Sequence, residues 1–152
     1  KDKVIVEVGA GPRGSLLYTK GNFKRGIVVE PLIDRWPPEI RKDYEDIGVE
    51  LIVAPYEDLE IDEQVDETWF FNVVQHVLDP TEQLELAKKT SKVVRVFEAL
   101  CQTTDQAHPW TVSEKLFTDV FGDFGKIFKG GTVEGFHSAD CYYGTWYASD
   151  NV

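Results

Sequence analysis

The sequence predicts an α/β fold, a doubly wound sheet of seven strands that is mostly parallel with an antiparallel last strand. Short β-branched runs alternate with amphipathic segments, which is the pattern of a parallel sheet covered by helices on both faces. The first run breaks into spaced glycines, as a buried strand does where it meets a ligand-binding turn. The alternation stops after Gly122, which predicts a final pair of strands without a full helix between them.

The predicted elements follow this alternation along the chain. The strands of the parallel part are expected at residues 3–8, 26–30, 49–53, 67–72 and 92–98, and the terminal pair at 126–129 and 142–148. The helices are expected at residues 14–20, 37–46, 56–59 (a single turn) and 80–90. Pro38 and Pro80 suit a first helical turn, where a missing N–H costs nothing. Thr111–Glu114 resembles a capping segment for a helix that ends near Phe121, before a glycine. We predict a single domain over residues 1–152.

Composition favours a globular protein without a membrane or nucleic-acid partner. Hydrophobic residues make up 42% of the chain, which argues against disorder. No apolar run approaches the ~20 residues that cross a membrane, and no signal peptide is recognisable. The two cysteines form no C-x-x-C pair, so the sequence predicts reduced thiols, a cytoplasmic location and no metal site. The formal charge of −11 would repel phosphate backbones, and a homodimer is left open.

The most informative segment is the glycine turn that follows Val4–Val8. Its spacing is Gly9-x-Gly11-x-x-Gly14, and Ala10 lies between the first two glycines. Glycines permit tight-turn geometry and let the backbone come close to a ligand. The spacing also fits the dinucleotide fingerprint of Rossmann-like sheets, so alone it predicts only a nucleotide-like cofactor.

Two acidic residues narrow the choice of cofactor. Glu7 lies two residues before the first glycine in an apolar strand, where a carboxylate is costly to bury without a cationic or hydrogen-bonding partner. A sulfonium cofactor with an α-ammonium group would supply that partner, whereas an NAD-type cofactor brings an anionic pyrophosphate to this turn. Glu30 ends the next apolar run and follows Gly11 by nineteen residues, the expected position of an acid that binds a ribose diol.

With these residues the chain resembles the class I S-adenosylmethionine-dependent methyltransferases. Glu7–Gly11 is similar to their first motif, and Glu30 to their ribose-binding acid. Asp66–Pro80 resembles the fourth-strand segment of the small-molecule members, and His108–Thr111 is similar to a late segment of that group. The resemblance implies a Rossmann-like sheet with an antiparallel ending, S-adenosyl-L-methionine as cofactor and a small molecule as methyl acceptor.

The resemblance also implies a set of cofactor-binding residues. They are Glu7, Gly9, Ala10, Gly11, Glu30, Pro31, Tyr56, Glu57, Asn72 and Val73. The family often has an acid directly after the third strand to meet the adenine amino group, and here Ala54-Pro55-Tyr56 follows instead. Glu57 or a backbone group is then expected at the adenine, while Tyr56 could pack on the ring.

Methyl transfer is an in-line displacement in which the protein mainly positions and desolvates the reactants. An oxygen or nitrogen acceptor can need a general base, and histidine is the usual one near neutral pH. His76 and His108 are the catalytic candidates, with helix-start packing and an ordinary surface loop as their structural alternatives. Trp110 and His137 are candidates for the acceptor side of the site.

Two other function classes stay open. One is a cofactor-binding subunit without catalysis, which would need a partner to complete its site. The other is an NAD(P)-binding oxidoreductase. Detecting methyl transfer to a metabolite pool would distinguish a methyltransferase from a non-catalytic subunit. The identity of the bound cofactor would distinguish a methyltransferase from an oxidoreductase. A nucleic-acid methyltransferase is disfavoured because Asn72 is followed by Val73-Val74 and not by the Pro-Pro-aromatic signature of enzymes that methylate bases.

Overall fold

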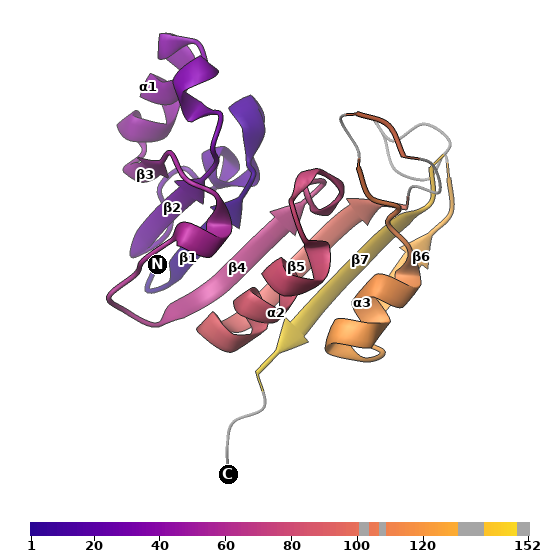
Figure 1. Ribbon diagram of the computed structural model, residues 1–152. Coiled ribbons are helices and arrows are strands. Elements are labelled where there is room, and N and C mark those ends of the chain that lie inside the picture. Colours follow the sequence, from indigo (N-terminus) through magenta and orange to yellow (C-terminus); the bar gives the residue numbers. More distant parts are fainter. Residues whose placement is uncertain (101–103, 107–108, 131–138, 149–152) are drawn as a thin grey trace.

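The computed structural model describes residues 1–100, 104–106, 109–130 and 139–148 (Figure 1). Its centre is one seven-stranded sheet with the order β3-β2-β1-β4-β5-β7-β6. The strands are β1 (Val4–Val8), β2 (Arg25–Val29), β3 (Val49–Ile52), β4 (Val65–Phe71), β5 (Ser91–Ala99), β6 (Gly125–Phe128) and β7 (Cys141–Tyr147). The α-helices are α1 (Pro38–Asp46), α2 (Pro80–Thr90) and α3 (Glu114–Phe121). Short 3₁₀ helices are η1 (Gly11–Arg13), η2 (Ser15–Thr19), η3 (Ile33–Arg35), η4 (Tyr56–Asp58) and η5 (Val74–His76).

The strand directions confirm the predicted sheet. Strands β1 to β5 pair in parallel, whereas β7 pairs antiparallel with both β5 and β6. Figure 1 shows β7 running opposite to its neighbour β5. The last strand is therefore the antiparallel one, and it inserts between β5 and β6.

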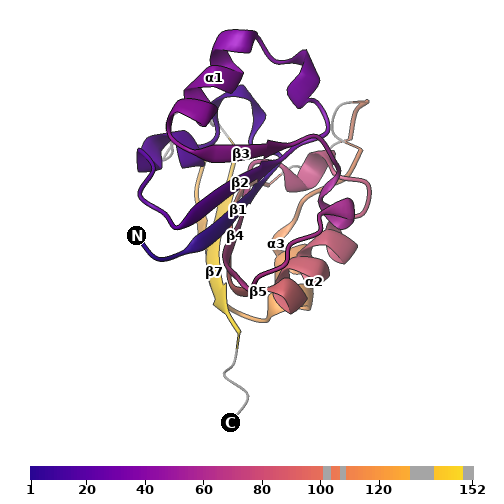
Figure 2. The same ribbon diagram turned by 90° about the vertical axis from the view of Figure 1, so that its left-hand side faces the viewer.

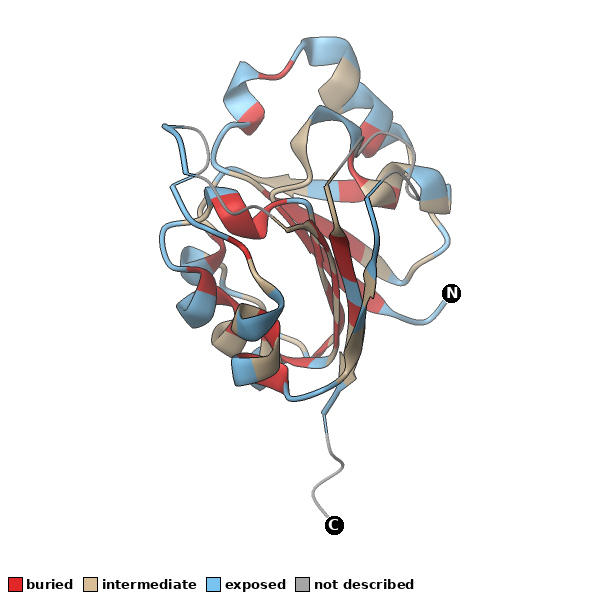
Figure 3. Ribbon diagram, turned by 90° about the vertical axis from the view of Figure 1, so that its right-hand side faces the viewer, coloured by how far each residue is buried: buried red, intermediate tan, exposed pale blue. Residues whose placement is uncertain are grey.

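Two hydrophobic clusters cover the two faces of the sheet, because neighbouring residues of a strand point to opposite sides. On β1, Ile5 belongs to the cluster that packs under α1, with Tyr44 and Trp36. Val6 and Val8 belong to the larger cluster with the helices α2 and α3. Figure 2 shows α2 and α3 together beside β5, with α1 apart from them, and Figure 3 shows the buried residues concentrated along the strands.

One predicted helix differs from the structure. Where an α-helix was expected at residues 14–20, the structure has the 3₁₀ helix η2 (Ser15–Thr19), preceded by the separate turn η1. The segment stops early because Lys20 and Gly21 both adopt left-handed backbone angles, with φ of 53° and 73°. The helix at 80–90 is confirmed, and the Asp79 carboxylate caps it by accepting a hydrogen bond from the Glu82 amide at 3.0 Å.

The topology places several polar loops at one edge of the sheet. In a parallel sheet the carboxyl ends of the strands share an edge, and ligands bind in the crevice beyond it. The turn after β1, Glu30 after β2 and the loop after β4 all lie at this edge. Within the described residues, no helix is both long and apolar enough to span a bilayer, and no cluster of His, Cys, Asp or Glu side chains could hold a metal ion.

Candidate functional site

The glycine turn after β1 has a conformation that its sequence requires. Gly9 and Gly11 both have positive φ, at 59° and 60°, which favours glycine. A Cβ on Gly9 would lie 2.0 Å from Cγ2 of Val73, so the turn packs directly against the loop after β4. A Cβ on Gly11 would meet nothing within 4 Å, so open space lies beside this glycine. The turn therefore has one side that is filled by protein and one side that can accept a ligand.

Glu7 lies beneath this turn and is 1% exposed. Its Oε1 accepts a hydrogen bond from the Ser15 amide at 2.6 Å, and its Oε2 accepts one from the Leu16 amide at 2.7 Å. Burial raises the pKa of Glu7, while these two backbone hydrogen bonds act against that rise. The structure thus gives Glu7 the role of capping η2. Its contact with a cofactor ammonium group stays a prediction.

Tyr44 is a residue of this turn that the sequence analysis missed. It comes from α1 and is fully buried. Its hydroxyl accepts a hydrogen bond from the Gly14 amide at 2.7 Å and donates one to the Gly11 carbonyl at 3.1 Å. An amphipathic helix shows which of its residues are buried, but no sequence pattern ties its tyrosine to a turn thirty residues earlier.

Glu30 lies at the carboxyl end of β2, as predicted. Its side chain is half-buried, and its Oε1 accepts a hydrogen bond from the Leu32 amide at 2.9 Å. The Glu30 amide donates to the Ile52 carbonyl of β3 at 3.0 Å, which fixes the backbone at this point. A carboxylate has about four lone-pair sites, so this one retains acceptor capacity for a ligand. The neighbouring Pro31 is exposed.

The loop after β4 is held by another buried carboxyl group. Asn72 is exposed and has a positive φ of 57°. The amides of Val73 and Val74 both donate to Oε1 of Glu98, at 2.8 and 3.0 Å. Burial raises the pKa of Glu98 to about 8, and its Oε2 has no hydrogen-bond partner among the described residues. Glu98 also escaped the sequence analysis, where it reads only as the last charged residue of a strand.

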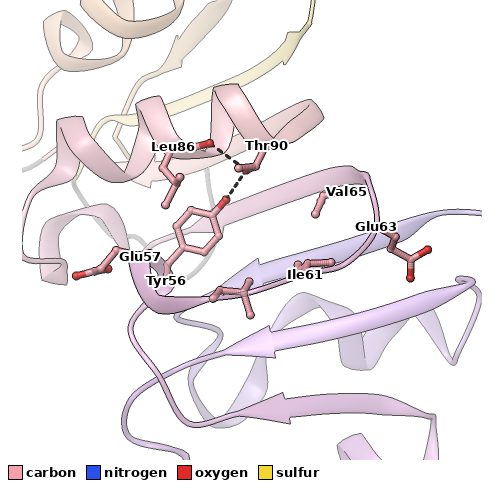
Figure 4. Close-up of a pocket in the computed structure, with 8 residues that line it drawn as sticks. Tyr56, Glu57, Ile61, Glu63, Val65, Leu86 and Thr90 are labelled. Carbon is pink, nitrogen blue, oxygen red and sulfur yellow. Dashed lines mark hydrogen bonds between the residues drawn. The ribbon is translucent and has the colours of Figure 1, made fainter.

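Tyr56 and Glu57, the two candidates for the adenine contact, differ in burial: Tyr56 is buried and Glu57 is exposed. Tyr56 is 5% exposed, and its hydroxyl pairs with Oγ1 of Thr90 on α2 at 3.2 Å. Its ring and Leu86 line a pocket of about 240 Å³. Figure 4 shows the ring of Tyr56 pointing toward Thr90 of α2. The side chain thus packs toward α2, and the expectation that its ring packs on adenine stays a prediction. Glu57 is exposed and accepts a hydrogen bond from Nε2 of Gln83 at 2.6 Å.

The acceptor-side candidates are placed only in part. His76 is exposed in η5, and its amide donates to the Val73 carbonyl at 2.8 Å, which puts it in the loop beside the glycine turn. Trp110 is 41% exposed, and its indole Nε1 donates to the Val77 carbonyl at 2.8 Å. This bond ties the segment after β5 to the loop after β4. His108 and His137 lie outside the described residues.

Comparison with known proteins gives no relative at the level of sequence and many at the level of fold. No family model matches the chain, and no curated protein matches it. Among solved structures, the N-methyltransferase NodS of Bradyrhizobium japonicum superposes with a TM-score of 0.71 at 12% identity, over 97% of this chain and 86% of that chain. The 1,6-didemethyltoxoflavin-N1-methyltransferase of Burkholderia thailandensis gives 0.66 at 15% identity, over 99% and 72%.

A third solved structure is the Haloferax volcanii complex between the Trm112 methyltransferase activator and a methyltransferase. It gives a TM-score of 0.68 at 13% identity, over 97% of this chain and 83% of that chain. At such identities the likeness concerns the fold. The strand order, the antiparallel β7 and these superpositions agree, and the chain has the class I methyltransferase fold.

Proposed function

We propose that the protein binds S-adenosyl-L-methionine and transfers its methyl group to a small-molecule acceptor. One observation carries the proposal: the open side of the glycine turn and the half-exposed carboxylate of Glu30 lie at the carboxyl edge of adjacent parallel strands. Solved neighbours support it, since NodS was also crystallised with S-adenosyl-L-homocysteine, and the toxoflavin enzyme with this product and its substrate.

The residues present fit such a cofactor. The backbone of Gly9, Ala10 and Gly11 can approach the methionine part, because the space beside Gly11 is open. The Glu30 carboxylate can accept hydrogen bonds from both ribose hydroxyls. Val73 would form a wall of the same site, since it already packs against Gly9.

When bound, the cofactor supplies a sulfonium methyl group with its own leaving group, so the chain has to bind, orient and exclude water. His76 would then lie near the acceptor and could take its proton. We propose that His108, Trp110 and His137 complete the acceptor side, with His108 as the other base. The predictions of a cytoplasmic location, of no nucleic-acid partner and of a homodimer left open stay predictions.

The test of the cofactor site is a titration of the wild-type protein and of Glu30→Ala with S-adenosyl-L-homocysteine. Hydrogen bonds to a charged group are worth ~1.5–3 kcal/mol, so the variant should bind about 10- to 150-fold more weakly. Asp34→Ala is a matched control, since it removes an exposed carboxylate a few residues further along. Equal affinity of wild type and Glu30→Ala would refute the assignment.

Catalysis needs a separate measurement. The wild-type protein, given S-adenosyl-L-methionine with a labelled methyl group and a mixture of polar metabolites, should release S-adenosyl-L-homocysteine and label a small molecule. Cofactor binding without any labelled product would favour the non-catalytic subunit instead. One solved neighbour is a complex of a methyltransferase activator with a methyltransferase, which makes that alternative worth testing by repeating the assay in a cell extract.

A further inference from the structure

Side chains hold three consecutive backbone amides directly after the glycine turn. The Gly14 amide donates to the Tyr44 hydroxyl at 2.7 Å. The next two amides, those of Ser15 and Leu16, donate to the two carboxylate oxygens of Glu7. Amides at the beginning of a helix have no partner within the helix. Without Tyr44 and Glu7, these three amides would need water or a ligand as partner. The turn is therefore fixed before any cofactor binds.

The Tyr44 hydroxyl spans the turn itself. It accepts from the Gly14 amide, and it donates to the Gly11 carbonyl at 3.1 Å. The hydroxyl thus donates its proton to the residue that begins η1, Gly11, and accepts a hydrogen bond from the residue that follows η1, Gly14. The ring cannot swing away, because it is fully buried and stacks on Trp36 with ring centroids 5.6 Å apart.

The space around this hydroxyl is closed. A Cβ on Gly14 would lie 2.5 Å from the Ala10 Cβ, 2.8 Å from the Tyr44 hydroxyl and 2.9 Å from Oε2 of Glu7. Real Cβ atoms essentially never approach so closely, so only a glycine fits between Ala10, the Tyr44 hydroxyl and Glu7. The conformation of the turn therefore depends on a side chain from α1, which lies far along the chain.

We propose that Tyr44 is a positioning residue for the cofactor: its hydroxyl fixes the Gly9–Gly14 turn in the conformation that receives the methionine part. This inference rests on the proposed function. It gives α1 a role in cofactor binding, although α1 lies outside the glycine motif in the sequence. The ribose and adenine would lie beyond β2 and β3, and the hydroxyl makes its hydrogen bonds to Gly11 and Gly14 and not to residues that follow those strands.

The experiment compares two ligands on three proteins. S-adenosyl-L-homocysteine carries the methionine part, and 5′-methylthioadenosine lacks its amino and carboxyl groups. Wild type, Tyr44→Phe and the control Tyr142→Phe are titrated with both. Tyr142 is equally buried, on β7, and its hydroxyl has no hydrogen-bond partner among the described residues. Each protein is also melted, to separate lost affinity from lost stability.

Tyr44→Phe should bind S-adenosyl-L-homocysteine about 5- to 30-fold more weakly, because a Gly14 amide without its buried partner makes the binding conformation of the turn less populated in the free protein. Its affinity for 5′-methylthioadenosine should change less than about twofold, as should both affinities of Tyr142→Phe. An unchanged ratio of the two affinities in Tyr44→Phe would overturn the assignment, whatever the melting temperature. Wild type that binds neither ligand would refute the proposed function, and this inference with it.

A second measurement needs no variant. In the ligand-free wild-type protein, hydrogen exchange of the Gly14 amide should be slowed as strongly as that of the β1 amides, because its partner is a buried hydroxyl. Fast exchange of this amide in the free protein would show a turn that forms only on binding, and would contradict the proposal.

Discussion

Hydrogen bonds from a few buried side chains hold the loops of this site, and the sequence alone does not predict all of them. The places of Glu7 under the glycine turn and of Glu30 after β2 could be predicted, because each stands at a fixed distance from the glycines, while their contacts with a cofactor stay predictions. Tyr44 and Glu98 could not, since each reaches the site from an element that only the tertiary fold brings there. The adenine contact of Tyr56 stays a prediction. Its ring packs toward α2, a direction that its distance from β3 along the chain does not reveal.

Glu98 gives a prediction for the pH dependence of stability. Burial raises its pKa to about 8 in the folded protein, whereas an unfolded glutamate has the ordinary value of 4.5. Between these values the folded state binds a proton that the unfolded state releases, so this group lowers stability as pH rises from 4.5 to 8. Glu98→Gln should remove that slope, which is at most about 1.4 kcal/mol per pH unit.

Denaturant unfolding at several pH values between 5 and 8 measures the slope. Glu60→Gln is the matched control, since Glu60 is exposed, and it should keep the wild-type slope. If Glu98→Gln also keeps the wild-type slope, the carboxyl is ionised in the folded protein and its burial is misjudged.

At the scale of elements, the site depends on the contact between two loops. The turn after β1 meets the loop after β4 where Val73 fills the space beside Gly9. Sequence analysis predicted both loops, because each follows an apolar strand, but it predicted no contact between them. It also expected an α-helix at residues 14–20, and the structure has a 3₁₀ helix there, ended by Lys20 and Gly21.

A set of alanine variants measures this contact. Gly9→Ala should lose stability through its positive φ, by about 1–2 kcal/mol, and further through a Cβ that lies 2.0 Å from Val73. Gly48→Ala is the matched control, since Gly48 has a φ of 78° and nothing within 4 Å of its Cβ. Val73→Ala should recover part of the loss in Gly9→Ala and none of that in Gly48→Ala.

Denaturant unfolding of the single and double variants gives the coupling between the two positions. Additive effects of Gly9→Ala and Val73→Ala would mean that the two loops do not touch as described.

For the whole molecule, the alternation of strands and helices was enough to predict the sheet. β-branched runs predicted the parallel strands, and the missing helix after Gly122 predicted the antiparallel ending, both confirmed by the strand pairing. The strand order seen in the structure further shows that the loops after β1, β2 and β4 meet at one edge of the sheet. The acceptor could not be predicted in the same way. Its specificity depends on loop side chains, whose positions follow no period in the sequence.

The proposed binding of S-adenosyl-L-methionine at the carboxyl edge of the sheet can be tested directly. The most direct measurement is a titration of the wild-type protein with S-adenosyl-L-homocysteine and, separately, with NADH. We predict saturable binding of S-adenosyl-L-homocysteine with one site per chain, and no binding of NADH over the same concentrations. Tight binding of NADH without binding of S-adenosyl-L-homocysteine would contradict this proposal and favour the NAD(P)-binding alternative.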